Sequence, residues 1–149
     1  MWDIAIIGAG LAGLECGRRL KAAGYQVCVL DKSRGLGGRM ATRRVVTNQR
    51  ENIRVDHGLR YWPSPSGVLA PLTEELIAAG VLKRWHVSAY ELRENDTLMP
   101  VEAEPVYVAS QGMSAIAKYL AQGFRPDDTF LNGYRATHLR PYDPAAGGG

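Results

Sequence analysis

The chain has 149 residues, a hydrophobic fraction of 46% and a formal net charge of +3, which suits one domain with a hydrophobic core. No apolar run reaches the ~18–20 residues of a membrane-spanning helix, and the N-terminus lacks the basic region of a secretory signal. Two cysteines, Cys16 and Cys28, are too few for a disulfide framework, so we expect both to be small buried side chains. We therefore expect a cytoplasmic protein with no membrane partner.

The first predicted element is a strand over residues 3–7, which runs directly into a glycine-rich turn and a helix. The turn contains Gly8, Gly10 and Gly13 with the spacing Gly-x-Gly-x-x-Gly. In this pattern the first glycine permits a tight turn, the second lets the backbone approach a pyrophosphate, and the third lets the helix lie against the sheet. The helix begins near Leu11 and would direct its unpaired N–H groups and positive dipole end at the phosphates.

A second apolar strand, over residues 27–30, ends at Asp31, 18 positions after Gly13. The order of strand, turn, helix, strand and acid is typical of proteins that hold the adenosine and pyrophosphate of a dinucleotide. The alternative interpretation of the glycines is a tight turn without a ligand. A carboxylate accepts hydrogen bonds from ribose hydroxyls and repels a 2′-phosphate. Asp31 therefore disfavours NADP and leaves FAD or NAD as the cofactor.

A second glycine-rich stretch over residues 35–38 follows at the same carboxyl edge of the predicted sheet, from which it can reach the same pyrophosphate. Arg39 is the expected charge partner, because its planar fork matches phosphate oxygens. Residues 32–60 hold eight basic and two acidic residues, which could contact an anionic cofactor, form a solvated face or bind nucleic acid. We favour the cofactor and expect no nucleic-acid partner, because no recognition helix with aromatic stacking partners accompanies these charges.

The remainder of the chain predicts short extended segments around two helices. The extended segments fall at residues 43–47, 53–55, 85–94 and 101–109, with a surface loop at 63–67. The helices fall at residues 69–79, with Leu72, Leu76 and Ala79 on one stripe, and at residues 113–123. A third strand within residues 129–139, beside residues 27–30, would complete three parallel strands joined by right-handed crossovers.

The predicted fold class is therefore α/β, with a Rossmann-like FAD/NAD(P)-binding domain built on a parallel sheet and part of a second, β-rich substrate domain. The predicted units are a dinucleotide-binding unit at 1–60, a partial substrate-domain excursion at 61–108, a helix and third strand at 109–142, and a disordered tail at 143–149. Three strands leave an open sheet edge, so we expect a homodimer or a complementing carboxy-terminal half as a partner.

Four blocks of sequence resemble the flavin-containing amine oxidase superfamily and, within it, the renalase-like branch. In family order these blocks are residues 8–13, 31–43, 56–61 and 108–118, which match the amino-terminal half of the family pattern. Position 31 is aspartate where family members usually carry glutamate. The resemblance implies an FAD-dependent oxidoreductase that oxidises a small molecule, an amine or dihydronicotinamide-type substrate, by hydride transfer to flavin with oxygen as acceptor.

The resemblance also implies a set of cofactor-binding residues. They are Gly8, Gly10, Ala12 and Gly13 around the pyrophosphate, Asp31 on the adenosine ribose with Lys32 beside it, Gly38 and Arg39 near the phosphates, and Leu59 and Arg60 close to the flavin ring. His57 is the candidate acid or base, because an unperturbed imidazole has a pKa of about 6.5. The alternative for His57 is a histidine hydrogen-bonded in a strand beside the cofactor.

The other histidines share no metal-ligand spacing with each other or with cysteine, so we expect no metal site. Two other functions remain open at this stage. One is a NAD-dependent reductase or dehydrogenase on the same fold, for which one nucleotide fingerprint would suffice. The other is a non-catalytic dinucleotide-binding module.

Overall fold

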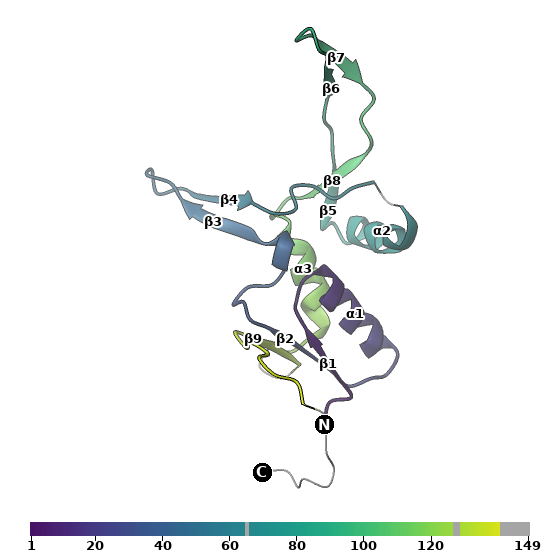
Figure 1. Ribbon diagram of the computed structural model, residues 1–149, viewed down its shortest axis with the longest axis vertical. Helices are drawn as coiled ribbons and strands as arrows, with labels where there is room; N and C mark the ends of the chain where they lie inside the picture. The colour runs from purple at the N-terminus through teal and green to yellow at the C-terminus, as the bar shows by residue number, and fades with distance from the viewer. Residues whose placement is uncertain (65, 127–128, 141–149) are drawn as a thin grey trace.

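The centre of the fold is a three-stranded parallel sheet. The computed structural model describes residues 1–64, 66–126 and 129–140, and its sheet has the order β1-β2-β9, from β1 (Ile4–Ile7), β2 (Val27–Asp31) and β9 (Phe130–Asn132). Helix α1 (Leu11–Ala22) joins β1 to β2, and α3 (Ser114–Leu120) with the short helix η3 (Ala121–Gly123) precedes β9 (Figure 1). This arrangement confirms the predicted α/β, Rossmann-like fold with its parallel sheet.

The third strand is shorter than the extended segment predicted for residues 129–139. It ends at Asn132 because Gly133 has φ +79°, which turns the backbone out of the β region. The Gly133 N–H then donates to the Ser33 carbonyl at 3.1 Å, and the Tyr134 N–H donates to the Asp31 carbonyl at 3.0 Å. The chain after β9 is therefore held against the end of β2 instead of continuing the sheet. The predicted tail at 143–149 lies outside the described residues.

Helix α1 lies against the sheet because two of its residues lack a Cβ. A Cβ added at Gly13 would stand 1.8 Å from the Gly8 carbonyl oxygen, and one at Gly17 would stand 3.2 Å from Ile6 Cδ1 on β1 and 3.3 Å from Val29 Cγ2 on β2. Leu14, between them on the same face, is fully buried. The prediction that Gly13 permits the helix to approach the strand is thus confirmed. Sequence reasoning missed the equivalent role of Gly17.

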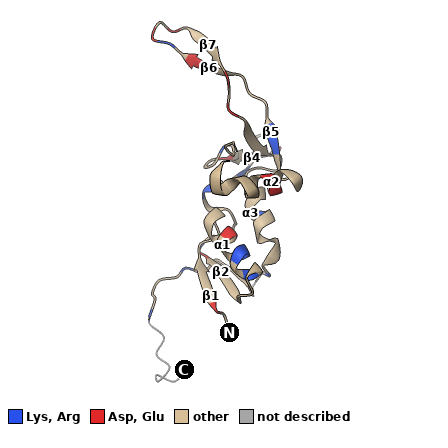
Figure 2. Cartoon of the chain, turned by 90° about the vertical axis from the view of Figure 1, so that its right-hand side faces the viewer, with Lys and Arg blue, Asp and Glu red and all other residues tan. Residues whose placement is uncertain are grey.

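In the described residues, three antiparallel strand pairs extend the chain beyond the sheet. They are β3 (Thr42–Val46) with β4 (Asn52–Asp56), β5 (Leu82–Trp85) with β8 (Val106–Ala109), and β6 (Ala89–Leu92) with β7 (Leu98–Val101). In two views at right angles the β6–β7 ribbon projects from the rest of the molecule (Figure 1, Figure 2). Its apolar side chains Tyr90, Leu92 and Leu98 are exposed, as is Ile7 on β1, and the predicted protein partner stays a prediction.

Helix α2 (Ala70–Ala78) packs beside β5 and follows the short helix η2 (Gly67–Leu69). Its buried residues are Leu72, Thr73 and Leu76, whereas the predicted Ala79 is exposed because the helix ends one residue earlier. Thr73 is buried because its hydroxyl accepts a 2.9 Å hydrogen bond from Trp62 Nε1 and donates to the Leu69 carbonyl. A threonine with both functions satisfied belongs to a core despite its polarity.

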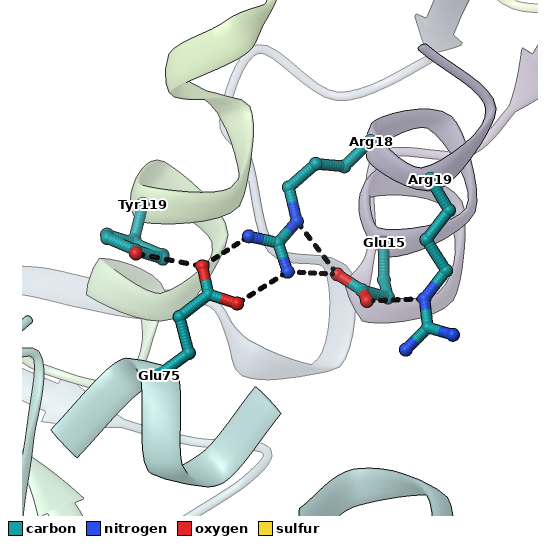
Figure 3. Close-up of polar contacts among 5 residues, drawn as sticks. All are labelled: Glu15, Arg18, Arg19, Glu75 and Tyr119. Carbon is teal, nitrogen blue, oxygen red and sulfur yellow. Dashed lines mark hydrogen bonds and ion pairs between the residues drawn. The ribbon is translucent and has the colours of Figure 1, made fainter. Parts of the chain in front are cut away.

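A polar network joins α1, α2 and α3 (Figure 3). Arg18 on α1 forms a two-pronged contact with Glu75 on α2, in which Nη2 lies 2.9 Å from Oε2, and Tyr119 on α3 donates to Glu75 Oε1 at 2.9 Å. The hydrogen bond from Arg18 outweighs the effect of burial and lowers the pKa of Glu75 below its usual value. The same network includes Glu15, which pairs with Arg18 at 3.0 Å and with Arg19 at 2.7 Å. These contacts fix the three helices against one another.

The two cysteines differ in their surroundings. Cys28 is buried in β2, as predicted, but Cys16 is exposed on α1, because the buried stripe of that helix is formed by Leu14 and Gly17. Within the described part of the chain, no helix combines the length and apolar character needed to cross a membrane.

Candidate dinucleotide-binding site

The two glycine-rich stretches meet at the carboxyl edge of the sheet. Gly8 has φ +109°, which turns the chain out of β1, and its N–H donates to the Leu30 carbonyl at 2.7 Å. Gly37 has φ +111°, forms a parallel bridge with Gly10, and donates its N–H to the Ala9 carbonyl at 3.0 Å. A Cβ on Gly38 would lie only 3.5 Å from the Gly10 Cα. The structure therefore places the second glycine-rich loop directly on the first.

The start of α1 opens onto this junction. Gly10 is the N-cap residue in an extended conformation, no side chain caps the helix, and its first turn contains no acidic residue. The three N–H groups at residues 11–13 therefore have no acceptor within the helix, and they lie at the positive end of the helix dipole. A Cβ added at Gly10 meets nothing within 4 Å. Ala12, in the same turn, is exposed. A diphosphate would find N–H donors and open space here, so the residues present fit that group.

Asp31, at the end of β2, is hydrogen-bonded to the backbone of the first glycine loop. Its Oδ2 accepts the Ala9 N–H at 2.6 Å, and its Oδ1 accepts the Ser33 N–H at 2.7 Å. Burial acts to raise the pKa of Asp31, but the N–H groups of Ala9 and Ser33, the Ser33 side chain and the charge of Lys32 together hold the pKa below the usual value. Each oxygen keeps a further lone pair that can accept a hydroxyl hydrogen. The Asp31 carboxylate thus fixes the glycine loop through its hydrogen bond with Ala9, a role that the sequence analysis did not predict. Its remaining lone pairs can still accept hydrogen bonds from ribose hydroxyls.

Arg39 lies in the short helix η1 (Gly38–Met40), and its backbone is hydrogen-bonded to the segment that follows β4. Its carbonyl accepts the Leu59 N–H at 2.8 Å, and a Cβ at Gly58 would stand 2.0 Å from that same oxygen. Leu59 packs against the hydrophobic core, whereas the side chains of Arg39 and Arg60 are exposed. Two regions predicted to contact the cofactor, around Arg39 and around Leu59, are therefore in direct backbone contact.

The remaining predicted site residues lie at the surface. Lys32 is exposed beside Asp31, and His57 is exposed in a bend that begins after β4 has ended at Asp56. The alternative that placed His57 within a strand is therefore wrong, because the pairing with β3 stops one residue earlier. Among the described residues, no group of three or more His, Cys, Asp or Glu side chains is arranged to hold a metal ion.

The structure adds a second set of residues, which fixes α3 beside the loops. Asp56 Oδ1 accepts hydrogen bonds from the Thr42 hydroxyl and from the Met113 N–H, the latter at 3.0 Å. The Thr42 hydroxyl in turn accepts the Ser114 N–H at 3.0 Å. Gly112, with φ +85°, is required because a Cβ there would lie 2.5 Å from the Thr42 methyl group. Asp56 and Gly112 both fall in the quoted sequence blocks, but nothing in the spacing indicated that both contact Thr42.

The sheet order, the glycine turn and the N-terminus of α1 together define a Rossmann-like dinucleotide-binding fold. Residues 6–76 match the model of a family described as an NAD(P)-binding Rossmann-like domain. That segment contains the first glycine loop, Asp31, the second glycine loop and the β3–β4 hairpin.

Curated relatives match about half of the chain or less. Thiamine thiazole synthase of Pyrobaculum aerophilum is 37% identical over 82 residues, which cover 51% of this chain and 31% of that protein. The 4,4′-diapophytoene desaturase (4,4′-diaponeurosporene-forming) of Staphylococcus haemolyticus is 47% identical over 38 residues, covering 26% and 8%. A solved structure of putrescine oxidase bound to putrescine matches with a TM-score of 0.50 and 23% identity over 68% of this chain and 22% of that one. The chain thus spans less than a third of these proteins, and the structural likeness shows a shared fold.

Proposed function

We propose that the chain binds FAD across its two glycine loops and serves as the cofactor-binding part of an oxidoreductase of the flavin amine oxidase type, in its renalase-like branch. The observation that carries this proposal is the contact of Gly37 and Gly38 with Ala9 and Gly10. A nicotinamide dinucleotide needs only the first of these loops. The second loop adds further N–H donors and Arg39, which face the same binding site from its other side.

Each part of the site has a stated task in this proposal. The N–H groups at the start of α1 bind the diphosphate, and Asp31 orients the ribose while holding the loop through Ala9. Arg39 supplies charge near the phosphates. Residues 59–60, attached to Arg39 through its carbonyl, lie near the flavin ring. Bound FAD would supply the acceptor for a hydride from an amine or dihydronicotinamide-type substrate, with oxygen taking the electrons onward.

The second candidate is NAD as the cofactor of a reductase or dehydrogenase. It is favoured by the description of the matched family. It is also favoured by the binding site itself, which fits any dinucleotide whose adenosine ribose carries no 2′-phosphate. The absorption spectrum of the purified protein separates the two candidates. A flavin band supports FAD, and a colourless protein that takes up NAD supports the second candidate.

The decisive experiment is a titration with FAD, followed by the flavin fluorescence, on the wild type and two variants. Asp31→Ala removes charge-assisted hydrogen bonds worth ~1.5–3 kcal/mol, so we expect its FAD affinity to fall by roughly ten- to a hundredfold. Asp3→Ala is the matched control, because Asp3 also accepts a backbone N–H, from Gln26 at 2.7 Å, at the opposite end of the same strands. Equal FAD affinity of wild type and Asp31→Ala would remove Asp31 from the site. Failure of folded wild-type protein to bind FAD would overturn the proposal.

A further inference from the structure

Beside the candidate dinucleotide site lies a cationic cleft of about 430 Å³, between the loop after β2, the β3–β4 hairpin and α3. Its charged lining side chains are Arg44, Arg54 and Lys118, and none of the acidic side chains that the structure describes lines it. The other polar side chains are Ser33, Thr42, Gln111 and Ser114. The cleft thus combines three positive charges with hydroxyl and amide groups in a space large enough for a small molecule.

The two arginines are placed at a cost to the hairpin. Arg44 and Arg54 stand directly opposite each other in the β3–β4 register, and like charges in that position destabilise an antiparallel pair. Over residues 1–64, 66–126 and 129–140, no ion pair is formed by Arg44, Arg54 or Lys118. Arg54 donates to Gln111 Oε1, a neutral acceptor, which orients its guanidinium without neutralising it.

The acidic residue on the same face of β4 as Arg54 is Asp56, and its Oδ1 accepts hydrogen bonds from groups other than the arginines. Its Oδ1 accepts the Thr42 hydroxyl and the Met113 N–H, and it does not line the cleft. Among the described residues no carboxylate forms an ion pair with either arginine, so a bound external anion would relieve the repulsion between them. Guanidinium forks bind phosphate oxygens in pairs, and Lys118 adds a point charge.

We propose that this cleft binds the phosphate group of a small molecule other than the dinucleotide. None of Gly8, Gly10, Ala12, Gly13 and Asp31 lines the cleft. Gly38, on the loop shared with the candidate dinucleotide site, does line it, so the second ligand would lie next to the first. The inference goes beyond FAD binding and rests on separate side chains.

The test is a calorimetric titration with inorganic phosphate at constant ionic strength. We expect saturable binding to the wild type and at least tenfold weaker binding to the Arg44→Gln/Arg54→Gln double variant. Lys118→Gln, which changes a different element, should weaken binding several-fold, and circular dichroism checks that each variant is folded. Arg50→Gln is the matched control, because it removes one charge from the turn of the same hairpin without touching the cleft. Phosphate affinities within twofold across the folded variants would overturn the proposal.

Two further titrations distinguish a separate phosphate site from the dinucleotide site and from a nucleic-acid site. Phosphate affinity should be unchanged in the presence of saturating FAD, and competition between them would show that the cleft holds the phosphates of the dinucleotide itself. A single-stranded oligonucleotide that binds through Arg44 and Arg54 a hundredfold more tightly than phosphate would instead identify a nucleic-acid site. If FAD fails to bind while phosphate binding still requires the two arginines, the proposed function fails and this inference stands.

Discussion

Glycines 10 and 13 lie three residues apart and should respond in opposite ways to the same substitution. In Gly13→Ala the added methyl carbon would stand 1.8 Å from the Gly8 carbonyl oxygen, about 1.6 Å short of the 3.4 Å at which ordinary contact begins. Because the obstacle is backbone at the end of β1, it cannot rotate away. The start of α1 must retreat from the sheet, although Leu14, one residue on, is fully buried against it.

The size of the effect follows from two opposing contributions. Overpacking of this kind costs up to about 3 kcal/mol, and replacing glycine by alanine inside a helix returns about 1 kcal/mol. We therefore expect Gly13→Ala to lose about 2 kcal/mol of unfolding free energy. Gly10→Ala should leave that free energy within about 0.5 kcal/mol of wild type, because its Cβ meets nothing within 4 Å and its φ of −82° suits any residue.

FAD binding should show the reverse order. The methyl group of Gly10→Ala would occupy the space that the proposal assigns to the diphosphate, so we expect at least tenfold weaker FAD binding by a fully folded protein. Urea unfolding and FAD titration of the same samples measure the two quantities. Gly123→Ala is the control for both, because a Cβ at Gly123 also meets nothing within 4 Å and the residue lies at the end of η3, after α3. Wild-type stability of Gly13→Ala would refute the packing argument, and wild-type affinity of Gly10→Ala would refute the position of the diphosphate.

Three further predictions concern single side chains. Arg39→Lys should weaken FAD binding several-fold in the same titration, because a point charge does not replace the fork, and equal affinity would remove Arg39 from the phosphates. Glu75→Gln should lose about 1 kcal/mol of unfolding free energy at pH 7, a modest value because Arg18 and Glu75 are about a third exposed. Since the folded-state pKa of Glu75 is lowered, its contribution is complete above about pH 4.5 and is lost as pH falls through the folded-state pKa. Wild type and variant should therefore converge in urea unfolding at low pH, and a constant difference would contradict this. Thr73→Val should lose about 1–3 kcal/mol in thermal unfolding, because the buried Trp62 Nε1–H loses its acceptor; unchanged stability would show that the hydrogen bond is not needed.

Local sequence patterns were sufficient for the parts of the fold that depend on neighbours in the chain. The glycine spacing, the apolar run of β2 and the periodicity of α3 each predicted an element that the structure contains. Boundaries were less accurate where a distant contact decided them. β9 stops at Asn132 because Gly133, with φ +79°, turns the chain so that the next two N–H groups donate to the Ser33 and Asp31 carbonyls, and the sequence around residue 132 does not indicate those partners.

The candidate site divides in the same way. Gly8, Gly13 and Asp31 were identified from spacing, because tight turns and close helix packing impose glycine at fixed intervals. The hydrogen bond between Asp31 and Ala9, the contact of Arg39 with Leu59 and the anchoring of α3 were not. Each of these joins groups that are many residues apart in the chain, and most of them pair a side-chain oxygen with a distant backbone N–H.

The sequence by itself determined that this chain turns from a strand into a helix through glycine and ends its second strand in an acid. Those features reflect the conformational freedom of single residues and the alternation of apolar side chains, both of which act over a few positions. Only the tertiary structure decided that the second glycine loop lies on the first, and that Arg44 and Arg54 share a cleft with Lys118. The physical reason is that strand register and helix docking bring together groups far apart in the chain, and the identities of those partners are set by the packing of the whole core.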